Sequence, residues 1–166
     1  MTGRLIVSDA NILIDMEVGG LLRQMFKLDV TFAVPNTLFE EELSAHHPDL
    51  QGLGLRSLEL HEATVAAVGE MVAKYQRTGV STNDLLALGL AQQETCPLLT
   101  GDAKLRTVAE REKVEFHGTI WLLGELLEKR LISVRQAAAG YDKMKRAGRR
   151  LPWEEAESQV ARFGKS

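Results

Sequence analysis

The sequence predicts an α/β fold with a mainly parallel sheet, on the basis of three observations. Short runs rich in Leu, Ile and Val alternate with helical segments along the whole chain. The first run, Leu5–Ser8, is apolar on both faces, as expected for a strand inside a parallel sheet. The 166 residues contain no internal repeat and no Gly- or Pro-rich linker, so we expect a single domain.

The strands are the short apolar runs. Val30–Val34 is predicted to end at Pro35, because proline cannot sit within a central strand. The predicted strands are Leu5–Ser8, Val30–Val34, Leu55–Leu60, Pro97–Thr100 and Val114–His117.

Helices are predicted between and after the strands. The segment Glu62–Gln76 has its apolar residues at helical spacing, which predicts one buried face made of Val65, Val68, Met71, Val72 and Tyr75. The other predicted helices are Asn11–Glu17, Leu21–Leu28, Asn36–Ala45, Ser81–Glu94, Asp102–Lys113, Thr119–Lys129, Ser133–Ala147 and Trp153–Phe163.

Composition excludes several classes of protein. Hydrophobic residues make up 45% and charged residues 26% of the chain, as in soluble globular proteins. The single cysteine, Cys96, excludes an internal disulfide framework and suits a reducing compartment. We find neither a signal peptide nor an apolar run near the roughly 20 residues needed to span a bilayer. We therefore expect a cytoplasmic protein without membrane association.

The charge is unevenly distributed. Residues 1–128 carry 10 basic and 19 acidic residues, whereas residues 129–166 carry 10 basic and 4 acidic residues. An acidic body favours a cation site, and a basic end favours contact with phosphate. Simple solvation of surface helices explains the same numbers equally well.

Acidic residues follow several predicted strands. Asp9 follows the first strand, the run Glu40–Glu42 lies in the helix after the second, and Asp102 follows the fourth through Gly101. Asp84 lies in the first turn of a helix. In parallel α/β sheets, ligands bind outside the carboxyl ends of the strands. Acids from distant parts of the chain are therefore expected to meet at one edge of the sheet.

Most of these acids also have an ordinary structural explanation. Asp84 fits a capping turn with Ser81, and Asp102 fits a helix N-cap. The run Glu40–Glu42 fits a solvated helix face, although residues about 100° apart cannot all point to water. Asn11 is suited equally to orienting an acid or a bound water and to capping a helix. Asp9 is the exception, since it closes a buried strand with no turn pair after it.

Clustered carboxylates repel one another unless a cation is bound between them. Oxygen ligands without His or Cys favour Mg²⁺ or Mn²⁺. Such an ion activates water and stabilises charge on a phosphodiester. The pattern therefore predicts metal-dependent chemistry on phosphate esters.

Four motifs resemble the PIN domain, the nuclease fold of the VapC-type toxins. They are the segment from Asp9 to Asp15 (DANILID), Val34-Pro35 with Glu41-Glu42-Leu43, the segment from Asn83 to Leu88 (NDLLAL), and the segment from Leu98 to Leu105 (LLTGDAKL). The last is the most specific. The resemblance runs in order from about residue 4 to 129, and the following tail resembles a longer prokaryotic subgroup.

The resemblance implies a three-layer α/β/α sandwich with extra C-terminal helices, and a Mg²⁺- or Mn²⁺-dependent endoribonuclease. It implies metal ligation by Asp9, Asp84 and Asp102, with one glutamate of the run as a further catalytic acid. Spacing from Pro35 favours Glu41 for that role, and the common Glu-Leu pairing favours Glu42. Asn11 and Thr100 are supporting candidates. Asp15 lies nearly two turns beyond Asp9 and is not expected in the site.

The resemblance also implies partners and a division of the chain. A toxin of this kind acts on RNA, is inhibited by a small antitoxin protein and commonly forms a homodimer. Residues 1–130 are expected to form the catalytic domain, and residues 131–166 a basic helical extension of it. The alternative is a catalytically silent module of the same fold that binds RNA or protein.

Other residues are less informative. Lys104 and Arg106 follow Asp102 and are placed to meet a substrate phosphate. The basic residues of the tail would contact RNA, cover the site of a neighbouring subunit or simply be exposed; these are Lys143, Lys145, Arg146, Arg149 and Arg150. Trp121 and Trp153 are expected as core anchors rather than base-stacking platforms. The four histidines lack zinc-like spacing and are expected to be structural.

Overall fold

A five-stranded sheet forms the centre of the computed structural model, which describes residues 4–165. All of its strand pairs are parallel, and the strand order is β3-β2-β1-β4-β5. The strands are β1 (Leu5–Ser8), β2 (Thr31–Pro35), β3 (Arg56–Leu58), β4 (Leu98–Leu99) and β5 (Phe116–His117). The α/β fold with a parallel sheet predicted from the sequence is confirmed.

The first strand of the chain is the middle strand of the sheet. Its register places Val7 opposite Ala33 of β2 and Leu98 of β4. Because all strands run the same way, their carboxyl ends meet at one edge. The residue that follows β1 therefore emerges at the centre of that edge.

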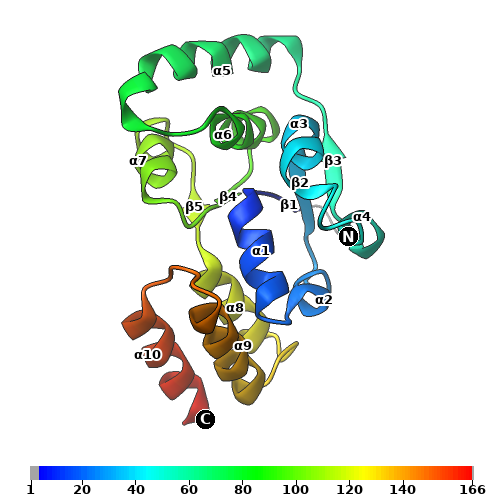
Figure 1. Ribbon diagram of the computed structural model, residues 1–166, viewed down its shortest axis with the longest axis vertical. Helices are drawn as coiled ribbons and strands as arrows, with labels where there is room; N and C mark the ends of the chain where they lie inside the picture. Colours follow the sequence, from blue (N-terminus) through cyan, green and yellow to red (C-terminus); the bar gives the residue numbers. More distant parts are fainter. Residues whose placement is uncertain (1–3, 166) are drawn as a thin grey trace.

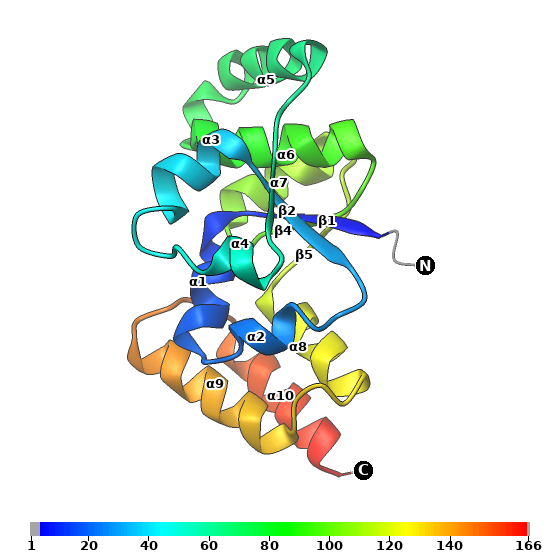
Figure 2. The same ribbon diagram turned by 90° about the vertical axis from the view of Figure 1, so that its right-hand side faces the viewer.

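Helices occupy both faces of the sheet, as Figures 1 and 2 show. Above it in Figure 1 lie α6 (Thr82–Glu94) and α7 (Ala103–Arg111), with α5 (Glu62–Lys74) outermost. Below it lie α1 (Ala10–Val18) and α8 (Thr119–Glu128), and beyond them α9 (Val134–Arg146) and α10 (Trp153–Gly164). The predicted three-layer α/β/α arrangement is therefore confirmed.

Short helical segments complete the chain. They are α2 (Leu22–Met25), α3 (Asn36–Leu38), the π-helix η1 (Phe39–Leu43), α4 (Leu50–Leu53) and the 3₁₀ turn η2 (Gln76–Thr78). Helix α2 is shorter than the predicted Leu21–Leu28, and α4 was not predicted. Pro35 is the last residue of β2 rather than the residue after it, a position where a missing amide costs one bond at the strand end.

The predicted helix Asn36–Ala45 is wrong in one respect that affects the site. Residues Phe39–Leu43 form a π-helix, in which each turn contains an extra residue. The Ser44 amide accordingly donates to the Phe39 carbonyl, five residues back. Angular spacing taken from a regular α-helix therefore fails for the three glutamates in this segment.

Helix α5 also departs from its predicted burial. Val68, Met71 and Tyr75 are buried, but the side chains of Val65 and Val72 are 53% and 38% exposed. The helix packs mainly on α6 and has nothing on its outer side, as Figure 2 shows. A single neighbouring helix covers only part of the apolar face that the sequence predicted.

The C-terminal helices are joined closely to the rest of the chain. Gly19 after α1 and Gly140 of α9 let the two helices approach, since a Cβ on Gly140 would lie 2.8 Å from Leu21 Cδ1. Helix α9 begins with a capping box formed by Ser133 and Gln136.

In residues 4–165, no helix combines the length and the apolarity that crossing a bilayer requires.

Candidate active site

Asp9 lies at the centre of the carboxyl edge of the sheet and is completely buried, with 0% exposure. Its backbone amide donates to the Leu99 carbonyl, and its side chain caps α1 by accepting from the Ile12 amide at 2.9 Å. The other carboxylate oxygen, Oδ2, has no hydrogen-bond partner among the described residues.

Burial raises the pKa of Asp9 to about 7 from an ordinary value of 3.8. The nearby Thr100 hydroxyl and the Ile12 amide oppose this shift, whereas the charges of Asp84 and Asp15 add to it. The expectation that Asp9 is a buried, poorly compensated acid at the end of β1 matches this environment.

Asp84 and Asp102 face the same edge from two other elements. Asp84 lies in the first turn of α6, where its amide donates to the Ser81 hydroxyl, so the capping interpretation of Ser81 is confirmed. Asp102 caps α7 by accepting from the Lys104 amide at 2.9 Å, so its N-cap interpretation is confirmed as well. Capping therefore uses one carboxylate oxygen of Asp102 and only the backbone amide of Asp84.

The same two acids interact with each other. The pKa of Asp84 is raised to about 6 by its burial, then by the neighbouring Asp102 carboxylate and by the charge of Glu42. Asp84 in turn raises the pKa of Asp9. Negative charge thus gathers here from β1, α6, α7 and η1, without a cationic partner for Asp9 or Asp84 among the described residues.

The three glutamates of η1 differ in what they contact. Glu41 is exposed and accepts a hydrogen bond from the side-chain nitrogen of Asn83, Nδ2, at 3.2 Å. Glu42 is the one whose charge acts on Asp84. Glu40 contributes its backbone carbonyl to the Ser44 hydroxyl. Glu42 is therefore the glutamate whose charge reaches Asp84, whereas Glu41 holds the preceding residue, Asn83, by a hydrogen bond.

The supporting residues also lie at this edge. Thr100 is fully buried, and its hydroxyl accepts from the Asp102 amide at 3.1 Å. Asn11 is exposed in the first turn of α1 and does not cap that helix, because Asp9 does. Arg106 donates from Nε to the Thr100 carbonyl at 3.1 Å, whereas Lys104 extends over Gly79 on the side of α6.

Two residues at this edge have a role that the sequence did not reveal. Arg149, in the loop between α9 and α10, donates from Nε to Asp15 at 2.6 Å and from Nη2 to the Asn11 side chain at 3.2 Å. The other oxygen of Asp15 accepts from the Thr119 hydroxyl at 2.8 Å. Asp15 therefore does not join the acid cluster but anchors the C-terminal loop beside it. The sequence offered one signal for this role, an aspartate within a helix that begins directly after a buried strand. Its partner, Arg149, lies 134 residues away and could not be found from spacing.

The chemistry of the candidate ligands suits a hard divalent cation, although within residues 4–165 the side chains are not arranged around a common point. All candidate ligands are carboxylate oxygens, and one of them, Asp9 Oδ2, is buried and has no hydrogen-bond partner within the part of the chain that the structure describes. Within residues 4–165, no three His, Cys, Asp or Glu side chains are positioned to hold a metal ion together. The residues therefore fit such an ion chemically and would have to close around it.

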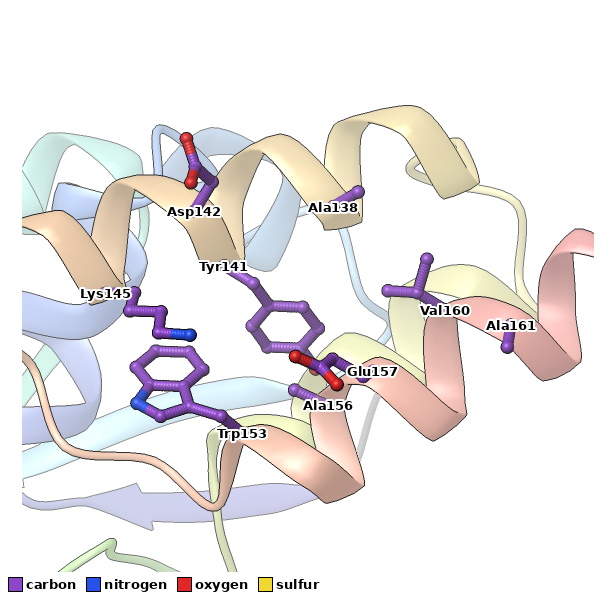
Figure 3. Close-up of a pocket in the computed structure, with 9 residues that line it drawn as sticks. All are labelled: Ala138, Tyr141, Asp142, Lys145, Trp153, Ala156, Glu157, Val160 and Ala161. Atoms are coloured by element: carbon purple, nitrogen blue, oxygen red, sulfur yellow. The ribbon is translucent and has the colours of Figure 1, made fainter.

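The surface has one hollow at the candidate site and another between α9 and α10. A hollow of about 400 Å³ lies in front of Asn11 and Asp102 and is bordered by Arg149 and Arg150. Another, of about 360 Å³, lies between α9 and α10, where Tyr141 and Trp153 meet edge to face (Figure 3). The second hollow shares none of its lining residues with the first and contains no acid cluster, so it is not part of the candidate site.

The comparisons with known proteins agree with this architecture. A three-layer α/β/α protein with acids gathered at the carboxyl edge of its sheet belongs to the class of α/β proteins with a polar ligand site at that edge. A family model described as a PIN domain matches residues 5–165. The chain therefore belongs to the PIN-domain family, whose members are generally nucleases, and a nucleic acid substrate follows from that membership. A search of curated proteins finds no match.

Proposed function

We propose that this protein is a Mg²⁺- or Mn²⁺-dependent endoribonuclease of the VapC-like kind. The observation that carries the proposal is Asp9, a fully buried carboxylate with an unpartnered oxygen and a pKa raised to about 7 beside a second acid with a raised pKa. A buried charge of this kind costs several kcal/mol unless a cation compensates it. Family membership makes a nuclease site the best reason for retaining that charge.

The proposed ligands are Asp9, Asp84 and Asp102, with Glu42 as the fourth acid. Glu42 is preferred to Glu41 because its charge reaches Asp84, whereas Glu41 holds Asn83 at the start of α6. Thr100 supports the site by fixing the Asp102 backbone. A divalent cation bound here would supply an activated water and stabilise negative charge on the phosphodiester. Arg106, held by the Thr100 carbonyl, is the proposed contact to a substrate phosphate.

A cleavage assay tests this function directly. Mixed-sequence RNA is incubated with the purified protein in Mg²⁺, in Mn²⁺ and in EDTA. We expect cleavage only with a divalent cation, and loss of cleavage in Asp9→Asn, which keeps the cap on Ile12. The matched control is Asp29→Asn, the same change at an exposed position outside the site. Cleavage by Asp9→Asn at the wild-type rate would exclude the proposed site.

A silent module that only binds RNA is the second candidate function. It is favoured by the observation that, among the described residues, no three potential ligands are arranged around a common point. The same assay separates the two candidates. A silent module retains RNA binding in both Asp9→Asn and wild type and cleaves RNA in neither.

The toxin role, the antitoxin partner and the homodimer remain predictions from the resemblance. For the chain itself, we propose that residues 131–166 are a basic extension of the catalytic part formed by residues 1–130, because Arg149 reaches Asp15 and Asn11. Growth arrest on expression of the wild type, absent with Asp9→Asn, is the expected sign of a toxin. Unchanged growth with an active nuclease would contradict that role.

A further inference from the structure

A smaller hollow adjoins the acid cluster and has a different lining. It measures about 240 Å³ and is lined by residues from α7, β5, the start of α8 and the loop before α10, together with Asp15 of α1 and Glu155 of α10. It shares Asp15, Gly101 and Arg150 with the hollow in front of Asp102. A polymer bound at the acids can therefore continue directly into this second space.

Two aromatic rings form part of its lining. His117, the last residue of β5, stacks on Trp121 in the first turn of α8, with ring centroids 4.1 Å apart and planes 16° from parallel. His117 Nε2 also lies 2.7 Å from Glu115 Oε2, which fixes the imidazole. Trp121 packs against the hydrophobic core, as expected, but its side chain is only partly buried and also lines the hollow.

Two arginines line the same hollow. Arg106 crosses Gly118, where an added Cβ would lie 2.3 Å from Nη2, so the absence of a side chain at residue 118 makes room for the guanidinium. Arg150 is exposed and has no hydrogen-bond or ion-pair partner among the described residues. It differs in this from its neighbour Arg149, which is held by Asp15 and Asn11. Arg106 donates to the Thr100 carbonyl through Nε alone, so its terminal nitrogens and the whole Arg150 guanidinium are suited to phosphate oxygens.

We propose that this hollow binds one unpaired nucleotide of the substrate strand, next to the phosphate that lies at the acids. The base stacks on the Trp121–His117 pair, and Arg106 and Arg150 contact the flanking phosphates. A base inside a duplex has both faces covered by its neighbours, so only a single-stranded or splayed base can stack on a protein ring. This inference rests on the proposed function for the identity of the strand as RNA and for the neighbouring phosphate at the acids.

The experiment measures binding without cleavage. The probe is a mixed-sequence RNA tetranucleotide with 2′-O-methyl groups, titrated in EDTA and followed by tryptophan fluorescence and calorimetry. We expect Trp121→Leu to weaken binding about tenfold or more, as for the loss of one base–aromatic stack. Trp153→Leu, the same change in the hollow between α9 and α10, should bind within twofold of the wild type. Circular dichroism confirms that both variants are folded.

The arginine gives a second variant that does not disturb packing. Arg150→Ala should lower the slope of log K against log salt concentration by about 0.7, the value for one phosphate contact on a single strand. The matched control is Arg135→Ala, which removes an exposed charge from α9 outside the hollow. Equal slopes in the two variants, or equal affinity in the two tryptophan variants, would overturn the proposal, as would a wild type that does not bind the probe.

Failure of this proposal and failure of the nuclease function give different results. A protein that cleaves RNA while Trp121→Leu and Arg150→Ala bind the probe like the wild type has the nuclease site without this nucleotide subsite. A protein that cleaves nothing while both variants lose binding has the subsite without the nuclease.

Discussion

Asp9 combines two properties that usually exclude each other in a stable protein. Its side chain is fully buried, and only one of its two oxygens has a hydrogen-bond partner among the described residues. The proton that a pKa of about 7 allows it to hold compensates its burial at low pH. At higher pH the carboxylate ionises and needs a cation. The residue therefore links the stability of the fold to pH and, under the proposed function, to the concentration of a divalent cation.

The first prediction concerns this link in the absence of divalent cations. Because the pKa of Asp9 is raised on folding, its contribution to stability is fully present below about pH 4 and is lost as pH rises through about 7. Relative to Asp9→Asn, the free energy of unfolding of the wild type should fall by on the order of 1 kcal/mol per pH unit across that window. Urea unfolding in EDTA at pH 5, 6, 7 and 8 measures the difference.

The control for this prediction is Asp29→Asn, which replaces an exposed aspartate. The free energy of unfolding of this variant should equal that of the wild type at every pH. Asp84, whose pKa is also raised, is present in all three proteins, so its effect largely cancels in the comparison. Parallel curves for wild type and Asp9→Asn would show that the Asp9 carboxyl titrates as in the unfolded chain.

The second prediction separates the two glutamates. Glu42→Gln should lower the rate of metal-dependent RNA cleavage about tenfold or more, a loss typical of disturbed metal surroundings. Glu41→Gln should retain most of the activity, because a glutamine oxygen still accepts the hydrogen bond from Asn83. Initial rates at saturating Mn²⁺ measure both. A larger loss in Glu41→Gln would restore the register favoured by the spacing from Pro35.

At the scale of single residues, the sequence predicted the aspartates better than the glutamate. Asp9 follows β1 directly and Asp102 comes three residues after the end of β4, and the direction of a parallel sheet determines where such residues emerge. The glutamates follow β2 by one turn, and their direction depends on a π-helix. No rule of spacing reveals that extra residue in the turn, because tertiary packing decides it.

Among the elements, α1 and α9 show how two helices are brought close by small residues. A Cβ on Gly140 would meet Leu21 Cδ1 at 2.8 Å and the Gly19 carbonyl oxygen at 3.2 Å. Gly69, in the interior of α5, has nothing within 4 Å of the same position. The two glycines therefore provide a matched pair, equal in helical setting and opposite in surroundings.

The third prediction uses this pair. Gly69→Ala should stabilise the protein by up to about 1 kcal/mol, because alanine is the better helix former and the site is open. Gly140→Ala should destabilise it by about 1–3 kcal/mol, since the clash exceeds that gain. Thermal unfolding of both variants measures the difference. A stabilised Gly140→Ala would mean that α1 and α9 do not approach as closely as described.

The sequence predicted the bounds of the helices better than it predicted their burial. The predicted bounds of α6, α8 and α9 agree with the structure within one or two residues, and the cap predicted at Ser81 is present at the start of α6. In α5 the periodicity predicted the helix but not its burial, because Val65 and Val72 lack a neighbouring element. A sequence indicates which side of a helix is apolar, whereas only the assembled fold shows whether anything covers it.

For the molecule as a whole, the uneven charge is organised around the candidate site. The acidic body supplies the carboxylates at the carboxyl edge of the sheet, and the basic C-terminal part supplies Arg149 and Arg150 beside them. Positive and negative groups thus meet at one place although they lie at opposite ends of the sequence. The sequence revealed the two charge blocks, but the ion pair that joins them depends on the fold.

The fourth prediction concerns the response of the whole protein to metal. At a fixed Mn²⁺ concentration, 100 times the dissociation constant at pH 8, binding to the folded state should add about 3 kcal/mol to its stability at that pH. The gain should be larger at pH 8 than at pH 6, because a cation must displace the proton that Asp9 retains below a pKa of about 7. Melting curves with Mn²⁺ and with EDTA at both pH values measure it. An equal gain in Asp9→Asn would place the ion elsewhere.

The central position of β1 has a consequence for the way the protein is made. The ribosome releases β1 first, but its second neighbour, β4, is synthesised roughly 90 residues later, which takes roughly 5–20 s at ordinary elongation rates. Until then one side of β1 has no partner strand, and Asp102 does not yet exist. A nascent chain therefore cannot contain the complete acid cluster, so the nuclease activity that we propose requires most of the chain to have been translated.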